Sequence, residues 1–306
     1  MLLSIFCFLF GLLLIYFSSN WLIDVSEKLG EIFKLPEILI GFLMLGFGTS
    51  APEIAISWYS AYIGNSSMLF GNIAGSNIMN VLLVFGLALA IKPISFHKPK
   101  IQTTVIFSIL TILFCLGIYL NYFSRIIGLI LLVLGCYNIY SSFAQDQENE
   151  LVRSRKNGKL KYSLLVLINL IFIIISSKII VSSGIEIADH FGINQGFFAM
   201  SFVAFGTSLP ELVLSLIAAS KNRGGLIVGN IIGSNICNIS FALGIAAIIK
   251  PFSVNDSDAL YIMGVLILST IMFLLSCYIR YFEKRLYGFL YLITFILSYI
   301  ELFMLG

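Results

Sequence analysis

Charged side chains are scarce in this chain, at 11% of its 306 residues, whereas soluble domains carry roughly 25%. Hydrophobic residues make up 59%, so there are too few polar groups to cover the surface of a soluble fold. Apolar runs of about 20 residues follow one another, and each is long enough to cross a hydrocarbon core of roughly 30 Å. The composition therefore predicts an all-α polytopic membrane protein.

Other features are also missing. The five cysteines include no CxxC pair and are expected to pack as small apolar groups, and the net charge of +3 is too small to indicate a nucleic-acid partner. No nucleophile–base pair stands out, so we predict a transporter rather than an enzyme, without a cofactor. The first apolar run lacks a preceding basic residue and a small-residue cleavage site, which favours a first span over a signal peptide.

The apolar runs predict ten transmembrane helices, at residues 2–24, 38–62, 67–91, 101–120, 124–143, 162–185, 194–219, 225–249, 259–279 and 286–305. With both termini outside the cell membrane, inward loops hold fifteen of the eighteen basic residues, outward ends hold Arg125 and Lys250, and Lys178 lies within a span. The positive-inside rule favours this orientation. It makes the polar stretch 145–161 a cytoplasmic linker.

The chain repeats itself at an offset of 158 residues. "GTSAPE" begins at residue 48 and "GTSLPE" at 206, while "GNIAGSNIMN" at 71–80 matches "GNIIGSNICN" at 229–238. Five spans in each half would insert the second half upside down, which is a common transporter architecture. We predict two inverted-topology five-helix repeats, residues 1–144 and 162–306, with motif regions at 41–93 and 199–251.

The first motif places a glutamate, Glu53 or Glu211, near the centre of a span. A charge there is expensive unless it meets a partner or water, and a bound cation is the natural counter-charge. Pro52 and Pro210 should free carbonyls and unwind the helix near the preceding glycine. Freed carbonyls, the carboxylates and nearby hydroxyls are hard oxygen ligands that suit Ca²⁺ or Na⁺; the hydroxyls belong to Thr49, Ser50, Thr207 and Ser208.

The second motif adds neutral ligands. Serine and amide side chains spaced four apart share one helix face, as Ser76 with Asn80 and Ser234 with Asn238. The glycines at 71, 75, 229 and 233 favour close helix packing. For the other asparagines, at 72, 77, 230 and 235, we predict interhelical hydrogen bonds rather than ligation.

Two carboxylates give the site a charge of −2, which one divalent or two monovalent cations would neutralise. A site that holds either kind of ion in turn suits an antiporter. At this point the motifs resemble the two alpha-repeats of the sodium/calcium exchanger family of the calcium/cation antiporter superfamily.

The resemblance implies that Na⁺ entering down its gradient drives Ca²⁺ across the membrane by alternating access, with the lipid bilayer as surroundings and no protein partner required. It also implies that Glu53 and Glu211 bridge the ion sites and that the carbonyl of Ala204 is a sodium ligand. The other implied ligands are Thr49, Ser50, Thr207, Ser208, Ser76, Ser234, Asn80 and Asn238.

Two features depart from the family pattern. Some relatives carry aspartate at the position of Asn238, and the amide argues against potassium co-transport; Lys178 would snorkel outward or pair with Glu186 or Asp24. Alternatives remain open: a proton-coupled calcium exchanger, a cation channel that uses Glu53 and Glu211 as a selectivity ring, and a non-transporting scaffold.

Overall fold

The computed structural model describes residues 1–33, 49–92, 98–145, 159–254, 258–279 and 285–305. Within these ranges the chain is helical and has no strand; a single antiparallel bridge joins Phe123 to Phe252. Their rings also stack, with centroids 5.0 Å apart. This contact ties the turn that follows α6 to the turn that follows α13.

The helices follow the apolar runs of the sequence. In the first half they are α1 (Leu2–Phe33), α3 (Ala51–Ile63), α4 (Ser66–Met79), the π-helical η2 (Asn80–Phe85), α5 (Gly86–Ile91), α6 (Ile101–Tyr119) and α7 (Arg125–Gln145). In the second half they are α8 (Lys159–Phe191), α9 (Gln195–Phe198), the π-helical η3 (Ala199–Val203), α10 (Ala204–Thr207), α11 (Leu209–Ser220), α12 (Gly224–Cys237), the π-helical η4 (Asn238–Leu243), α13 (Gly244–Ile249), α14 (Ala259–Tyr278) and α15 (Arg285–Leu305).

Six continuous helices in the described ranges are long and apolar enough to span a membrane. The bent pair Gln195–Thr207 and Leu209–Ser220, which turns by 48°, brings the number to seven. Leu2–Ser18 and Arg125–Ser141 are shorter apolar helices. Residues 38–48 of the predicted span 38–62 lie outside the described residues, and α3 contains residues 51–62 of it. The chain is therefore a membrane protein with several apolar helices.

Burial separates central from peripheral helices. In the spans Ser66–Ile91 and Gly224–Ile249, 89% and 83% of the apolar window is buried, against 33% for α8 and 22% for α15. Large apolar side chains such as Leu13, Ile174 and Leu297 are exposed on the outer helices. Exposed apolar surface of this kind suits lipid. The two central spans, with α3 and α11, therefore form a core that the outer helices shield.

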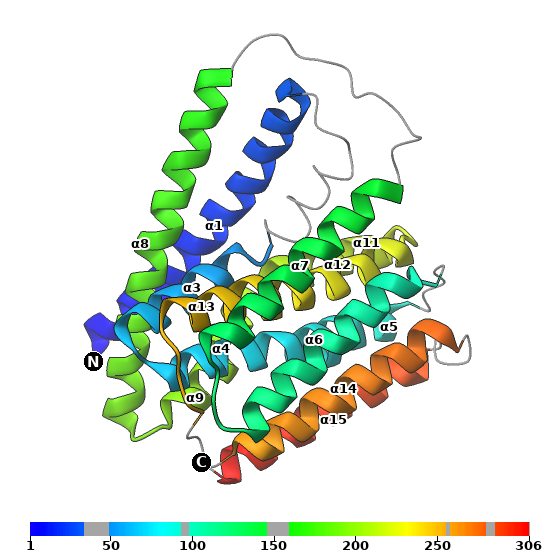
Figure 1. Ribbon diagram of the computed structural model, residues 1–306. Coiled ribbons are helices and arrows are strands. Elements are labelled where there is room, and N and C mark those ends of the chain that lie inside the picture. The colour runs from blue at the N-terminus through cyan, green and yellow to red at the C-terminus, as the bar shows by residue number, and fades with distance from the viewer. Residues whose placement is uncertain (34–48, 93–97, 146–158, 255–257, 280–284, 306) are drawn as a thin grey trace.

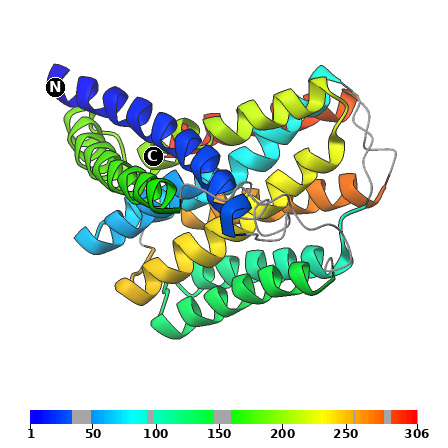
Figure 2. The same cartoon turned by 90° about the horizontal axis from the view of Figure 1, so that it is seen from above.

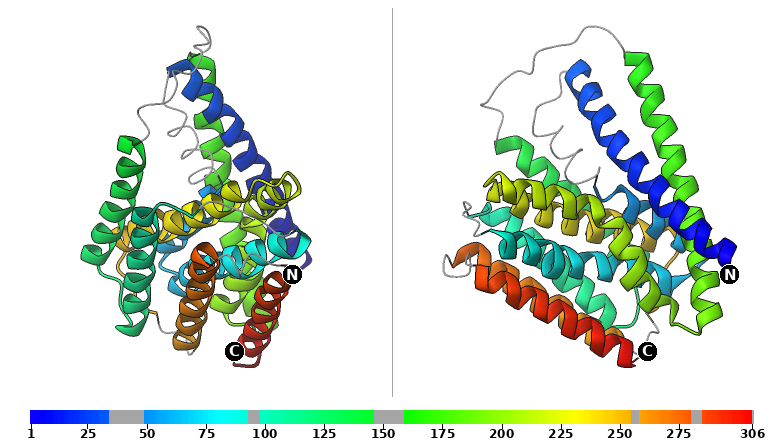
Figure 3. Two further views of the ribbon diagram at one scale, coloured as in Figure 1. Left: turned by 90° about the vertical axis from the view of Figure 1, so that its right-hand side faces the viewer. Right: turned by 180° about the vertical axis from the view of Figure 1, so that it is seen from behind.

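The long helices α1 and α8 form a pair that stands at a steep angle to the other helices (Figures 1 and 3). Seen from above, this pair lies on one side of the molecule and α6 with α7 on the other (Figure 2). A Cβ atom added to Gly11 of α1 would lie 2.8 Å from Ile180 of α8, so the two helices are in close contact. Leu12 packs on Gly206, where a Cβ would lie 2.5 Å from its side chain. Thus α1 passes directly over the bend between α10 and α11.

Small residues let α4 approach the segment that follows α8. A Cβ on Gly71 would lie 2.2 Å from the Gly196 carbonyl oxygen, and one on Gly75 would lie 2.5 Å from the Met200 carbonyl oxygen. The predicted packing role is confirmed for these two glycines. At Gly229 and Gly233 an added Cβ would meet no described atom within 4 Å, so their packing role stays a prediction.

We expect Gly75→Ala to destabilise the fold, because the new methyl group would collide with backbone atoms of Met200, which cannot swing aside as a side chain does. Overpacking of this kind costs about 1–3 kcal/mol. Thermal unfolding of the purified protein in detergent would measure the change. Gly264→Ala in α14 is the matched control, because Gly264 is exposed and has no neighbour within 4 Å of an added Cβ among the described atoms. Equal melting temperatures for the two variants would contradict the close approach.

Candidate functional site

The two motif glutamates occupy the first turns of two short helices, α3 and α11. Each helix has a proline at its start and a serine before it, Ser50 with φ −87° and ψ 4° and Ser208 with φ −83° and ψ 6°. The similar dihedral angles show that the two motifs fold alike. The sequence predicts unwinding near Gly206; in the structure Gly206 is helical, and the helix is interrupted and bends by 48° at Ser208. The corresponding prediction at Gly48 lies outside the described residues. Helix N-termini favour negative charge, which suits a carboxylate in the first turn.

Serine from each motif bonds the glutamate of the other. Ser208 Oγ donates to Glu53 Oε1 at 3.3 Å, and Ser50 Oγ donates to Glu211 Oε1 at 3.5 Å. Glu53 is 0% exposed and Glu211 1% exposed. The structure thus brings residues 49–53 and 206–211 to one buried centre.

The motif threonines lie at the same centre. Thr49 Oγ1 is 3.3 Å from Ser234 Oγ, which donates to Glu211 Oε1 at 3.2 Å. Thr207 Oγ1 donates to the Ala204 carbonyl at 3.2 Å, and the Ser208 backbone N–H donates to the same oxygen at 2.9 Å. Both acceptor positions of the Ala204 carbonyl are therefore in use, and ligation through it would require the Thr207 hydroxyl to turn away.

The two central spans supply the remaining predicted site residues. Ser76, Asn80, Ser234 and Asn238 are all 0% exposed. A π-helical turn begins at each asparagine, since η2 starts at Asn80 and η4 at Asn238. Wider turns of this kind are frequent at functional sites. The apolar pattern does not predict these turns, although both begin at the last residue of the repeated motif.

Several oxygen atoms at this centre have no hydrogen-bond partner among the described residues. They are Glu53 Oε2, Glu211 Oε2, Ser76 Oγ, Asn80 Oδ1 and Asn238 Oδ1. A buried polar atom without a partner costs about 1–3 kcal/mol, more when the group is charged. These five oxygen atoms could therefore accept a cation; Asn238 Nδ2, a donor, also has no partner among the described residues.

The other motif asparagines divide into two groups. Asn72 and Asn230 each bond the neighbouring helix, and Asn235 Oδ1 accepts from Asn80 Nδ2 at 3.0 Å. The predicted interhelical hydrogen bonds are confirmed for these three. The prediction is wrong for Asn77, because its amide donates to the Ile73 carbonyl of its own helix at 2.7 Å.

One contact of the core has no counterpart in the repeat. The Trp58 indole N–H of α3 donates to the Phe241 carbonyl in η4 at 3.0 Å. The positions 158 residues away from these two are Leu216 and Leu83. This hydrogen bond therefore occurs once, between the first half and the second.

Lys178 does not compensate the buried glutamates. Its side chain is exposed on α8, as expected for outward snorkelling. Glu186, one of its two predicted partners, instead accepts a hydrogen bond from Ser4 at 2.7 Å. Asp24, the other, is exposed on α1. The carboxylates at the centre therefore have hydroxyl and amide neighbours instead of this lysine.

The arrangement can bind hard cations. Hydrogen bonds join the two carboxylates with the hydroxyls of Ser50, Ser208, Ser234 and Thr49 at a buried centre, and Ca²⁺ takes six to eight oxygen ligands. No group of three or more His, Cys, Asp and Glu side chains that could hold a metal ion occurs in the described ranges. The donor set is therefore two charged groups among neutral oxygens.

Comparison with known proteins gives one consistent result. The family described as sodium/calcium exchanger protein matches residues 3–144 and 161–304. The chain is 34% identical over 297 residues to an uncharacterized membrane protein of Methanocaldococcus jannaschii, covering 95% of both chains. It is 24% identical over 339 residues to the sodium/calcium exchanger MaX1 of Methanosarcina acetivorans, covering 96% of this chain and 97% of MaX1.

A solved structure is also similar. The sodium-calcium exchanger NCX_Mj, soaked with Na⁺ and Ca²⁺, superposes with a TM-score of 0.66 at 30% sequence identity. The match covers 97% of this chain and 98% of that one. The similarity thus extends over almost the whole length of both proteins.

We expect Glu53→Gln and Glu211→Gln each to abolish stabilisation by Ca²⁺, because each removes half of the negative charge at the centre. A ligand at 100 times its dissociation constant stabilises a folded protein by about 2.7 kcal/mol. Thermal unfolding with and without Ca²⁺ would measure this stabilisation. Glu301→Gln is the matched control, since Glu301 is exposed on α15 and this variant should keep the wild-type shift. Retention of the shift in both buried variants would contradict the site.

Proposed function

We propose a function from the premise that this chain belongs to the sodium/calcium exchanger protein family. It is a secondary active antiporter that exchanges Na⁺ for Ca²⁺ across the membrane. The ions are its substrates. The family membership, the similar exchangers and the oxygen-lined centre all support this function.

One observation locates the ion-binding site at the two glutamates. Each glutamate accepts a hydrogen bond from the serine of the opposite motif, so the two halves share one centre. A single Ca²⁺ held there would neutralise both carboxylates, and two Na⁺ ions would do the same. Because both kinds of ion need the same carboxylates, they exclude each other, and this mutual exclusion couples their movements.

We assign the ligands as follows. Glu53 and Glu211 bridge the ions, and the neutral oxygens come from Thr49, Ser50, Thr207, Ser208, Ser76, Ser234, Asn80, Asn238 and the Ala204 carbonyl. The unpartnered oxygen atoms of Ser76, Asn80, Asn238 and both glutamates support this assignment. The Ala204 carbonyl joins the set when the Thr207 hydroxyl releases it.

Alternating access requires the centre to open to each side in turn. The α1–α8 pair is suited to this movement, because it packs against the core as a separate unit (Figure 1). Leu12 of α1 lies directly on Gly206, beside the bend of the site-bearing helix. A shift of α1 along the core would therefore change what covers the ions.

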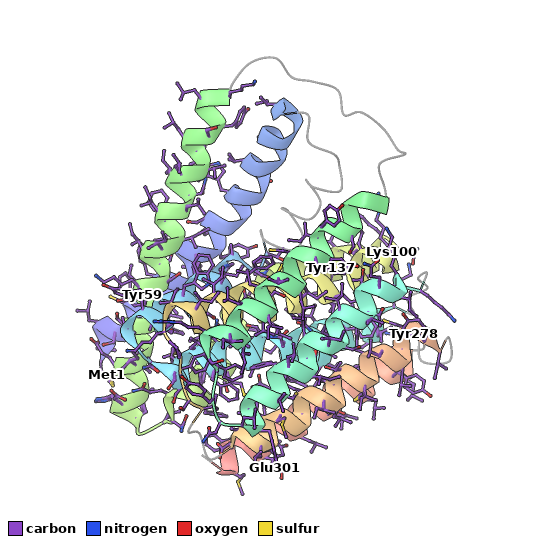
Figure 4. All side chains as sticks on the ribbon, in the orientation of Figure 1. Met1, Tyr59, Lys100, Tyr137, Tyr278 and Glu301 are labelled. Carbon is purple, nitrogen blue, oxygen red and sulfur yellow. The ribbon has the colours of Figure 1, made fainter. Side chains whose placement is uncertain are left out.

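The proposal includes the number and orientation of the transmembrane helices. Ten transmembrane helices form two inverted five-helix repeats, residues 1–144 and 162–306, with 145–161 as a cytoplasmic linker and both termini extracellular. Both chain ends lie in the lower half of Figure 1. In Figure 4, Lys100 lies near one end of the molecule, and Met1 and Glu301 lie toward the opposite end. This separation supports a basic inner side and an outer side with both termini.

Reconstituted wild-type protein should release Ca²⁺ from loaded vesicles when Na⁺ is supplied outside, because Na⁺ competes for the shared carboxylates. Release would be followed with a calcium-sensitive dye. Glu53→Gln should lower the rate by at least about 100-fold, since loss of one charged ligand removes several kcal/mol of binding. A proton gradient without Na⁺ should give no release.

Two results would indicate a different transport mechanism. Equal release under the proton gradient would indicate a proton-coupled exchanger. Ca²⁺ flux that is independent of any counter-gradient, together with single-channel currents, would indicate a channel. Glu301→Gln, which leaves the centre intact, should transport at the wild-type rate.

The topology is tested by thiol labelling of single cysteines in a chain whose five native cysteines are replaced. Asn121 and Asn222 are a matched pair, because both are exposed turn residues with positive φ, 58° and 56°. In right-side-out cells, a membrane-impermeant reagent should label Asn121→Cys directly and Asn222→Cys only after permeabilisation. The opposite pattern would reverse the proposed orientation, and labelling of both in intact cells would contradict the inverted repeat.

A further inference from the structure

We propose that Asn72 and Asn230 are positioning residues that hold the two ion-binding glutamates at a fixed distance from the neutral ligands of the next helix. The inference rests on the proposed function, because it concerns the same centre. It adds two residues that do not themselves ligate an ion. Each acts through the backbone of a glutamate.

The geometry is the same in both halves. Asn72 Nδ2 donates to the Glu53 carbonyl at 3.1 Å and to Ser57 Oγ at 3.0 Å. Asn230 Nδ2 donates to the Glu211 carbonyl at 3.3 Å and to Ser215 Oγ at 3.1 Å. One amide group thus binds two acceptors that lie one helical turn apart on the adjacent helix.

These contacts are fully buried. Asn72, Ser57, Asn230 and Ser215 are all 0% exposed, so water does not compete for the amide protons. In a dry environment a hydrogen bond is stronger electrostatically than in water. Losing the donor would also leave a buried serine hydroxyl without its partner. Each asparagine is therefore a rigid joint between two helices.

These asparagine hydrogen bonds affect the geometry of the ion site because they lie next to its predicted ligands. Ser76 and Asn80 follow Asn72 at intervals of four residues, on the same face of the α4–η2 span. Glu53 is the residue whose carbonyl Asn72 binds. The bond therefore fixes the carboxylate of α3 relative to the serine and amide oxygens of α4, and Asn230 does the same for Glu211 with Ser234 and Asn238.

Burial alone does not explain this choice of partner. Asn77 lies on the same helix and is 3% exposed, yet its amide is satisfied by the Ile73 carbonyl of its own helix. Asn72 and Asn230 instead bind across to α3 and α11, and their Oδ1 atoms have no hydrogen-bond partner in the described part of the chain. The arrangement uses the amide as a donor to the glutamate-bearing helix even though its oxygen stays unpaired.

The effect should be larger for Ca²⁺ than for Na⁺. A divalent ion at the shared centre is bound by both carboxylates at once. Displacement of Glu53 therefore weakens Ca²⁺ binding, because one of the two charged ligands is out of place. A Na⁺ ion, with half the charge, gains less from each carboxylate. A change in the ratio of the two affinities therefore reports on positioning, which a general loss of stability would not alter.

The test is calorimetric titration of Ca²⁺, and of Ca²⁺ in competition with Na⁺, into purified protein. We expect Asn72→Ala and Asn230→Ala each to weaken Ca²⁺ binding by about 10-fold or more, the usual effect of removing a group that orients a metal ligand. The Na⁺ concentration that half-displaces Ca²⁺ should fall, because Na⁺ binding is weakened less. Asn77→Ala, the matched control, should stay within about twofold of wild type in both affinities.

The outcomes are separable. If wild-type protein does not bind Ca²⁺ in competition with Na⁺, the proposed function fails. If wild type binds and both asparagine variants stay within about twofold of it, or Asn77→Ala is weakened equally, the positioning role is overturned. Should the alanine variants not fold, the double variant Ser57→Ala with Ser215→Ala removes one acceptor of each joint; about fivefold weaker Ca²⁺ binding would support the role, and an unchanged affinity would overturn it.

Discussion

Two carboxylates in one buried centre are the constraint on which the rest of this structure depends. Glu53 and Glu211 are buried, and each accepts a hydrogen bond from the serine of the opposite motif. Removing two like charges from water without a counter-charge is expensive. Hydroxyls and amides from both halves surround them, but such groups only solvate a charge and do not cancel it. A cation that enters the centre cancels the charge. This neutralisation favours binding of the ion, and its loss makes the empty centre unfavourable until another cation binds.

The backbone around this centre serves the same purpose. Prolines begin the two glutamate-bearing helices, serines stand at the bends, and π-helical turns begin at Asn80 and Asn238. Each of these irregularities lies at or beside a predicted site residue. Irregular backbone is tolerated inside a membrane protein where it is buried or lines a cavity. The regular outer helices provide that burial.

Two features of the sequence, the apolar runs and the internal repeat, predict much of this arrangement. Apolar runs locate helices such as α6 and α14 to within a residue or two, and the 158-residue offset pairs the motif residues. The ends of long helices with polar termini are harder to predict, because hydropathy reports the apolar stretch and not the end of the helix. Thus α1 continues to Phe33 and α8 starts at Lys159, beyond the predicted spans. That Ser50 bonds Glu211 and not its own Glu53 depends on how the halves pack. The partner of Asn77 depends on one rotamer, and no residue pattern specifies it.

The hydrogen bond between Trp58 and the Phe241 carbonyl has a consequence for how far the two halves are equivalent. Leucines, Leu216 and Leu83, stand at both matching positions. A leucine side chain cannot donate a hydrogen bond, so the contact between α3 and η4 has no matching bond between α11 and η2. At this point of the core the first half is the donor and the second half the acceptor, and the two halves are therefore not interchangeable.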